Sequence, residues 1–238
     1  QWNVTGNVTI PKNKLLEFPD LDGSSYANTY EVGKSLFIQK RFHGIGVKPE
    51  TGIYEFEDVN GNNNGSDFPE DLQSLKSISQ KYYGGINNNF KYKTLELSVF
   101  LQIVNQTGLG YFSGFGLPGT IGNQPRWVTN RWQKPGDIAE VQKYTLGIDQ
   151  AATAYYLISN SADNNIVDAS FVRLKNISLS WDLPGKWISK AKMTKSRVYL
   201  QGQNVLTFTK YKGLDPETQS LTSLPPIRMI TGGIQVTF

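Results

Sequence analysis

The sequence predicts an all-β protein whose antiparallel strands, about seven of them, form part of the wall of a transmembrane β-barrel. Several stretches alternate apolar and polar residues with a period of two, which is the period of a strand with two unlike faces. Long and short connections alternate along the chain, and aromatic residues stand where strands begin and end. The 23 glycines, 11 prolines and 12% aromatic residues favour turns and strands over helices.

The overall composition limits the function. The chain has 238 residues and no cysteine, so neither a disulfide framework nor a thiolate metal site is available. The net charge of +4 comes from scattered Lys and Arg residues rather than from the basic patch that nucleic acid requires, so no nucleic-acid partner is expected. No run has the ~18 apolar residues of a membrane helix. Because the chain starts at Gln1 without Met or a signal sequence, we expect that a preceding part has been removed.

The expected strands cover residues 2–10, 31–46, 84–92, 95–106, 169–182, 197–208 and 227–238. The stretch 95–103 is the clearest, because five aliphatic residues alternate strictly with other side chains. At the rise of a strand these residues span about 30 Å, which with tilt suits the apolar band of a membrane barrel.

Two of these strands break the alternation. In 31–46, Lys34 and Lys40 share a parity with the apolar residues, so this strand is the least regular. In 169–182, Arg173 and Lys175 share a parity with Ile177, Leu179 and Trp181. That end of the strand must therefore lie near lipid headgroups, extend its cations toward water, or contain a bulge.

The connections distinguish a barrel wall from a soluble β-sandwich. If the strands run up and down in sequence, the long connections 47–83, 107–168 and 209–226 lie at one end. The connections 11–30, 93–94 and 183–195 lie at the other end. Long loops on one side and short turns on the other are typical of outer-membrane barrels. Aromatic residues mark strand ends, as interface girdles do: Trp2, Tyr92, Trp181, Phe208 and Phe238. A sandwich explains the alternation equally well but the loop asymmetry less well.

Two groups of loop residues are candidate binding sites. Asp58, Asn60 and Asn62 place oxygen atoms at alternate positions, like the start of a calcium loop. Pro69 stands where the bidentate Glu is expected, so an Asn/Gly-rich turn is the alternative. The second group combines tryptophan and arginine in the order Arg126, Trp127, Arg131 and Trp132. An aromatic face and a guanidinium group can bind sugars, peptides or carboxylates, or they can pack within the loop itself.

The residues do not predict an enzyme or a cofactor. His43 is the single histidine of the sequence, so neither a Ser-His nor a His-metal constellation is expected. No pair of carboxylates stands out for acid–base chemistry. We therefore read the chain as non-enzymatic.

Three segments carry a family resemblance. Residues 169–184, reading ASFVRLKNISLSWDLP, resemble the last part of the SusC/RagA-like TonB-dependent outer-membrane transporters. Residues 197–217, reading RVYLQGQNVLTFTKYKGLDPE, resemble the same family, and 224–238 fit its ending. Weaker matches at 13–19 and 58–61 extend the resemblance over nearly the whole chain.

The resemblance implies the C-terminal part of a 22-stranded barrel, with residues 1–238 lacking the plug domain and the earlier strands. It implies the outer membrane of a Gram-negative (Bacteroidota) bacterium, and import of oligosaccharides or peptides. The implied partners are the remainder of the same barrel, membrane lipid, a SusD-like surface lipoprotein, and TonB through the N-terminal part. Ile234, Val236 and Phe238 resemble the signal that the barrel-assembly machinery reads, and they suit a lipid-facing position as well. The alternatives are a non-transporting SusC-like scaffold subunit and a soluble carbohydrate-binding sandwich.

Overall fold

A computed structural model describes residues 1–110, 115–189, 192–220 and 222–238. The chain forms two compact units. The first, here the sheet unit, comprises Gln1–Pro11, Gln80–Gln106 and Ala169–Phe238. The second, the loop unit, comprises Lys12–Ser79 and Thr107–Asp168. None of the described helices is long and apolar enough to cross a membrane.

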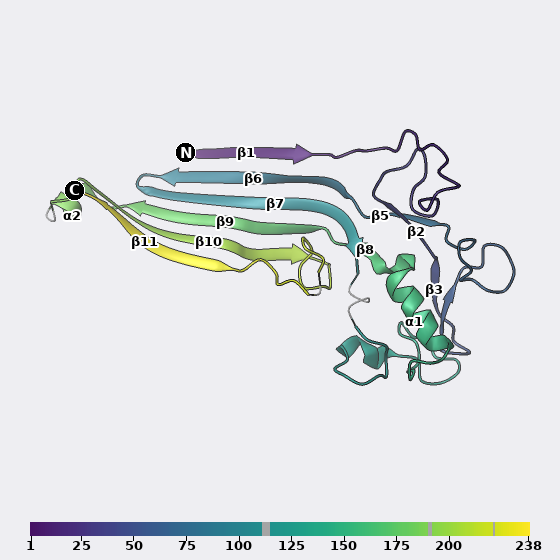
Figure 1. Cartoon of the computed structure of the whole chain (residues 1–238). Coiled ribbons are helices and arrows are strands. Elements are labelled where there is room, and N and C mark those ends of the chain that lie inside the picture. The colour runs from purple at the N-terminus through teal and green to yellow at the C-terminus, as the bar shows by residue number, and fades with distance from the viewer. Residues whose placement is uncertain (111–114, 190–191, 221) are drawn as a thin grey trace. The chain divides into compact units, whose positions relative to one another are not determined.

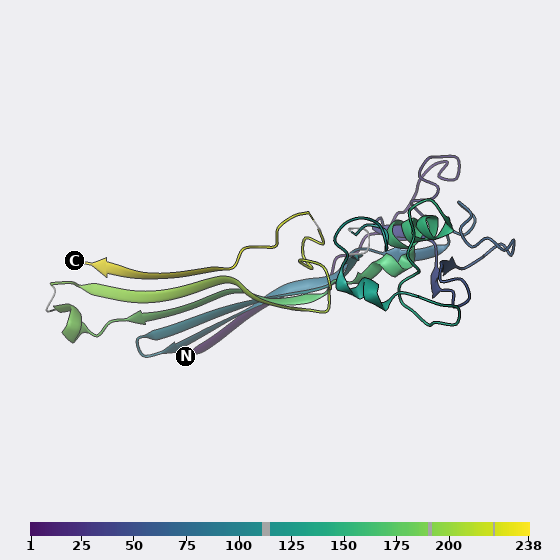
Figure 2. The same ribbon diagram turned by 90° about the horizontal axis from the view of Figure 1, so that it is seen from below.

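The sheet unit is built on one antiparallel sheet with the strand order β1-β6-β7-β9-β10-β11 (Figure 1). Its strands are β1 (Trp2–Thr9), β6 (Gln80–Tyr92), β7 (Leu95–Leu109), β9 (Phe171–Asp182), β10 (Lys195–Thr209) and β11 (Met229–Thr237). The turn 93–94 and the short helix α2 (Gly185–Ile188) lie at one end of this sheet, together with the start of β1 and the end of β11 (Figure 1). The strands form a single layer (Figure 2). The prediction of a mainly antiparallel β protein is therefore confirmed.

The predicted strand over 31–46 is wrong. Residues 38–41 form β2 (Ile38–Arg41), which pairs with β5 (Ser74–Ser77), and residues 44–47 form β3 (Gly44–Val47), which pairs with β4 (Tyr54–Phe56). All four lie in the loop unit. The physical reason is the poor alternation, because lysines on the apolar parity leave no continuous face to join a large sheet.

This correction changes the connections. Residues 10–79 form one long connection between β1 and β6, so 11–30 belongs with the long connections rather than with the short turns. The sheet has six long strands, and a short seventh, β8 (Ile166–Asp168), pairs with the end of β7 at 107–109. The alternation of long and short connections is thus more regular than the sequence predicted.

A bulge resolves the irregular start of β9. On β7, Phe100 and Leu101 are consecutive, but their partners on β9 are Asn176 and Leu174. Lys175 is the extra residue, and it reverses the parity of everything before it. Leu174 therefore joins the apolar face and Arg173 the polar face, so the bulge is the correct one of the three explanations.

The loop unit has its own apolar core. The helix α1 (Gln150–Asn160) begins at Asp149, whose side chain accepts a hydrogen bond from the Ala152 amide at 3.0 Å. Its buried face joins β4 and neighbouring segments in a core of Phe42, Tyr54, Phe56, Leu72, Ala154, Tyr155, Ile158 and Ala162. Two 3₁₀ turns, η2 (Arg126–Asn130) and η3 (Asp163–Asn165), complete this unit's helices among the described residues.

Candidate functional site

The register of the six long strands sorts their side chains onto two unlike faces. Residues paired across an antiparallel sheet point to the same side, so the pairing defines each face directly. The apolar face carries Trp2, Val4, Val8, Ile86, Phe90, Tyr92, Leu95, Leu97, Val99, Leu101, Leu174, Ile177, Leu179, Trp181, Val198, Leu200, Leu206, Phe208, Ile230, Ile234 and Val236.

The apolar face is largely uncovered. Trp2 is 65% exposed, Leu200 is 53% exposed and Ile234 is 68% exposed, and these residues lie on three different strands. Soluble monomers rarely expose a continuous apolar patch of this extent. Within the described part of the sheet unit no second sheet packs on this face, so the β-sandwich alternative is not supported. The face has the chemistry of a surface that meets hydrocarbon.

The opposite face is polar and largely uncharged along its middle. It carries amides and hydroxyls at Asn3, Thr5, Asn7, Asn87, Asn89, Ser98, Asn176, Ser178, Ser180, Gln201, Gln203, Thr231 and Gln235. Charged groups lie toward the ends. At the short-turn end, the Arg197 Nε donates a hydrogen bond of 2.6 Å to Asp182. This face has the chemistry of a surface that meets water.

Two aromatic side chains on the polar face lie over glycines. A Cβ atom on Gly233 would come within 2.4 Å of the Tyr199 ring, and one on Gly85 within 2.5 Å of the Phe100 ring. Glycine is required at these positions because the ring occupies the space of a side chain. Each ring shields the backbone of a residue that is otherwise unfavourable in a strand.

A buried charged cluster occupies the other end of the polar face. Arg173 is 1% exposed, and its Nε donates to the Thr207 hydroxyl at 3.0 Å. Its terminal nitrogens form ion pairs with Asp215 and Glu217, and its guanidinium carbon lies 5.0 Å from the centre of the Phe171 ring. Both carboxylates come from the connection between β10 and β11. Arg173 therefore anchors this connection to the polar face of the sheet.

Neighbouring side chains reinforce the anchor. Lys175 Nζ lies 3.6 Å from the Glu217 carboxylate, and Gln102 donates to the same carboxylate at 3.3 Å. Gln106 donates to the carbonyl of Pro216 at 2.7 Å. Asp215 accepts hydrogen bonds from two backbone amides of its own turn. Burial, together with the negative charge of Asp215, raises the pKa of Tyr211 in the same connection.

Sequence reasoning missed this cluster, although one signal pointed toward it. The cationic side chain of Arg173 has an apparently apolar parity, for which the sequence offered lipid headgroups, extension toward water or a bulge, but not a buried partner. The sequence separation of more than 40 residues between Arg173 and its carboxylates hid the partners.

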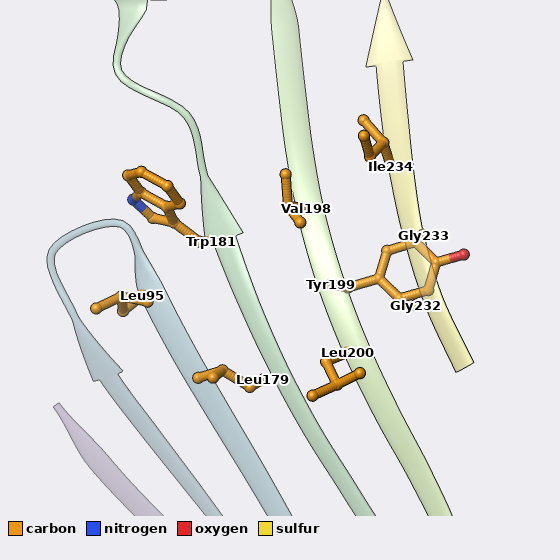
Figure 3. A pocket seen from close by; sticks show the side chains of 9 residues that line it. All are labelled: Leu95, Leu179, Trp181, Val198, Tyr199, Leu200, Gly232, Gly233 and Ile234. Carbon is orange, nitrogen blue, oxygen red and sulfur yellow. The ribbon is translucent and has the colours of Figure 1, made fainter. Parts of the chain in front are cut away.

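A shallow groove of about 560 Å³ crosses the apolar face near the short-turn end (Figure 3). Seven of its lining residues are on the apolar face of β7, β9, β10 and β11: Leu95, Leu179, Trp181, Val198, Leu200, Gly232 and Ile234. Tyr199 and Gly233 also line it, although they have the parity of the polar face. Gly232 leaves a gap between Ile230 and Ile234, because the nearest atoms to a Cβ at this position would be 3.9 Å away. Trp181 also contacts Trp187 of α2 edge to face, with 5.7 Å between ring centres.

The predicted assembly signal consists of Ile234, Val236 and Phe238. All three are placed where a lipid-facing residue is expected. Ile234 and Val236 are on the apolar face of β11, opposite Val198 and Ser196. Phe238 follows the strand and is 84% exposed. Their role in assembly stays a prediction.

The Asp58 turn of the loop unit is organised by its own backbone. The Asp58 carboxylate accepts hydrogen bonds from the amides of Gly61, Asn62 and Asn63. The Asn62 side-chain amide donates to Asp67. Because amide hydrogens already occupy the Asp58 oxygens, this arrangement favours the Asn/Gly-rich turn over the calcium site. Asn60 accepts from the amide of Asn62 at 3.1 Å, in the same kind of turn.

Two of the four Arg and Trp candidates are engaged within the loop unit. The Trp132 indole nitrogen donates to the carbonyl of Pro49 at 2.8 Å, and its ring lies against Gly52. The guanidinium carbon of Arg131 lies 3.8 Å from the centre of the Tyr144 ring. Trp127 contacts Phe115 edge to face, and Arg126 is exposed. The contacts of Arg131, Trp132 and Trp127 favour internal packing, and Arg126 stays the best candidate of the four for a ligand contact.

The Asp163 carboxylate connects several segments of the loop unit. One carboxylate oxygen lies 2.8 Å from His43 Nδ1, 2.8 Å from the Ser74 hydroxyl and 3.2 Å from Lys76 Nζ. The other accepts from the Gly44 amide at 3.2 Å. Burial opposes ionisation of Asp163, but the hydrogen bonds from His43, Ser74, Gly44 and Lys76 outweigh it and lower its pKa to about 2. The single histidine thus has a structural partner.

Comparison with known proteins supports the interpretation of the sheet. No family model matches the chain. TonB-dependent receptor P3 of Formosa agariphila is 24% identical over 286 aligned positions, which cover 100% of this chain and 27% of the receptor. TonB-dependent receptor SusC of Bacteroides thetaiotaomicron is 22% identical and covers 92% of this chain. The chain spans about a quarter of the length of these curated relatives.

Solved structures show the same fold. The match to the RagAB peptide importer in its open-open state covers 100% of this chain and 27% of the importer chain. Its TM-score is 0.73, and the sequences are 22% identical. A structure of the RagAB peptide transporter matches with a TM-score of 0.67 and 24% identity.

The fold, the two unlike faces and these similarities liken the chain to a portion of the TonB-dependent receptors. Within that class, the resemblance to a portion of the SusC/RagA-like TonB-dependent transporters, predicted from the sequence, is confirmed. The reading of the chain as non-enzymatic is confirmed as well, since the relatives are receptors, transporters and importers by name.

Proposed function

We propose that the chain forms part of the barrel wall of a TonB-dependent importer in the outer membrane of a Bacteroidota bacterium. The observation that carries the proposal is the six-stranded sheet, whose one face is apolar and exposed and whose other face is polar. Hydrocarbon would satisfy the first face and an aqueous barrel interior the second. The similarity to receptors from Formosa and Bacteroides supports the cellular location.

The finer parts of the proposal follow the family resemblance. The complete barrel would have 22 strands, residues 1–238 would be its C-terminal part, and the rest of the protein would supply the remaining strands, the plug and the contact with TonB. A SusD-like surface lipoprotein would cover the barrel, and the cargo would be oligosaccharides or peptides. The names of the RagAB structures, a peptide importer and transporter, support peptides, and the name SusC supports the lipoprotein partnership.

The proposal is tested on the full-length protein that contains this chain. We expect it to remain in the membrane fraction until detergent is added. It should also migrate differently on gels before and after heating, because a folded barrel resists the detergent. A full-length protein that is soluble without detergent would contradict the proposal. Loss of growth on the cargo after deletion of the gene, restored by the wild-type gene, would test import itself.

The β11 residues supply a separate test of assembly. We propose that Ile234, Val236 and Phe238 contribute to recognition by the barrel-assembly machinery. Phe238→Ala should lower the amount of protein in the outer membrane severalfold, because Phe238 makes few contacts that folding alone would need. Thr237→Ala, a neighbouring change on the other parity, is the control. Normal abundance of the Phe238→Ala protein would show that Phe238 is only a lipid-facing residue.

A further inference from the structure

The groove on the apolar face is a candidate lipid site. We propose that it holds an acyl chain of an anionic glycerophospholipid, whose headgroup lies against lysines at the short-turn end of the sheet. This inference rests on the proposed function, because it requires the apolar face to lie in a bilayer.

The lining of the groove fits a hydrocarbon chain. Aliphatic side chains from four adjacent strands form it, and Trp181 lies toward the short-turn end (Figure 3). The groove has a volume of about 560 Å³ and is open along the surface of the sheet. A flat barrel surface would offer an acyl chain contact on one side only, whereas a groove contacts it on several sides and slows its exchange.

The groove depends on a glycine that the packing of the sheet does not require. Gly233 must be glycine because the Tyr199 ring covers it, but a Cβ atom on Gly232 would meet only ordinary contacts, at 3.9 Å. Glycine weakens a strand, since it has no side chain to pack and loses more backbone entropy on folding. The apolar alternation of β11 would place a branched residue at 232. The gap therefore has a cost in stability that an occupant of the groove would offset.

One end of the groove has the features of a membrane interface. Trp181 pairs with Leu95, which directly follows the turn 93–94. Trp187 contacts Trp181 and is 60% exposed, and Tyr92 is 70% exposed. Exposed Trp and Tyr side chains settle at the level of lipid headgroups, where the ring is in apolar surroundings and the polar atom reaches water. A chain in the groove would have its headgroup at this end.

The charges at this end favour an anionic headgroup. Lys93 occupies the turn and Lys186 precedes Trp187 in α2. In the part of the chain that the structure describes, no ion pair involves either lysine. The nearby carboxylates of Asp182 and Glu96 are on the polar face, where they lie close to Arg197. The lysines are therefore available to a phosphate group, which they attract electrostatically.

The test measures lipid retained by the full-length protein. The protein is purified in mild detergent, and bound phosphatidylglycerol and phosphatidylethanolamine are quantified by mass spectrometry. It is then reconstituted into nanodiscs that contain both lipids. We expect phosphatidylglycerol to be enriched over its share in the membrane. A Cβ atom at position 232 would meet only ordinary contacts, so Gly232→Val should occupy part of the groove and reduce the retained phosphatidylglycerol about tenfold.

Matched variants separate the two parts of the site. Gly6→Val makes the same change on the same face, at β1 and outside the groove, and should leave retention unchanged. Lys93→Gln combined with Lys186→Gln should remove the preference for phosphatidylglycerol over phosphatidylethanolamine while the total retained lipid stays the same. Heat-modifiable migration on gels confirms that each variant is folded.

Three results would overturn the inference. They are equal retention in wild type and Gly232→Val, equal retention of both lipids in wild type, and an unchanged preference in the double lysine variant. The last two need no change in the groove, so they apply even if Gly232→Val fails to fold. If any of these results is obtained while the protein still needs detergent and still shows a heat-modifiable band, the lipid site is refuted but the proposed function is not. Solubility without detergent would contradict the proposed function instead.

Discussion

Arg173 is the residue on which the most contacts of the polar face converge. Its charge is buried, and it compensates two carboxylates from a connection more than 40 residues later. Removing one partner of a buried ion pair leaves an uncompensated charge, which destabilises by about 3–5 kcal/mol. Arg173→Met should therefore release the connection between β10 and β11 and lower the temperature at which the barrel loses its heat-resistant form.

The measurement is limited proteolysis of the full-length protein, which should cut between residues 210 and 220 in Arg173→Met and not in wild type. Arg173→Lys should be intermediate, because lysine keeps the charge but cannot form both ion pairs. Lys175→Met removes the partly exposed cation near Glu217 and should reduce the protection much less than Arg173→Met, because an exposed ion pair contributes little. Equal protection of Arg173→Met and wild type would show that the cluster does not hold the connection.

Asp163 makes the stability of the loop unit dependent on pH. Its folded pKa of about 2 is below the ordinary value of 3.8, so its ionised form favours the folded state. The contribution, about 2 kcal/mol, is present above pH ~4 and is lost as the pH falls from about 4 to about 2. Pepsin digestion across this window should cut the loop unit increasingly as the pH falls.

Asp163→Asn tests the assignment. The variant should be less stable at pH 6, and its digestion should vary less between pH 4 and pH 2 than that of wild type. Ala154→Gly, which weakens α1 in the same unit without changing a titratable group, controls for general destabilisation. A pH dependence that is identical in wild type and Asp163→Asn would assign the effect to other carboxylates.

Among the elements, β9 shows that one residue decides the placement of a whole strand end. The extra residue Lys175 moves Arg173 from the apolar to the polar face. Deleting Lys175 should remove the bulge and leave Leu174 on the apolar face and Arg173 on the polar face, because the remaining residues then alternate regularly. The deletion variant should therefore still assemble in the membrane. Lys175→Ala keeps the residue count and should assemble at close to wild-type abundance, measured by immunoblot of outer membranes. Loss of assembly in the deletion variant alone would mean that the bulge itself is needed, and not only the placement of Arg173 on the polar face.

The elements also show what the sequence can and cannot predict. The period of two identified all six long strands and both faces, because exposure to two unlike media imposes a strict alternation. It failed at 31–46, where short strands lie in a unit with its own core and no continuous face is imposed. The period of two also could not reveal the Arg173 cluster. The carboxylates that neutralise Arg173 lie in an irregular connection, where side chains follow no periodic pattern.

At the scale of the whole molecule, the two edges of the sheet determine how the chain behaves alone. Both β1 and β11 pair on one side only, so each presents a row of backbone amides and carbonyls. These groups cannot be satisfied in lipid, and in water they invite pairing with other chains. Residues 1–238 expressed alone should therefore aggregate and show no heat-modifiable form, whereas the full-length protein should show one. A monodisperse, heat-modifiable product from residues 1–238 would contradict this.

The two-residue turn between β6 and β7 has a consequence for the order of folding. Closing it costs little chain entropy, whereas β7 and β9 meet across residues 110–170 and β1 and β6 across residues 10–79. The β6–β7 hairpin is therefore the natural nucleus, and β1 should join it late. Pulse-labelling hydrogen exchange during refolding would detect this order as early protection at 84–104 and late protection at 2–9. The same geometry explains how a slow, long-range topology can begin from a fast local event.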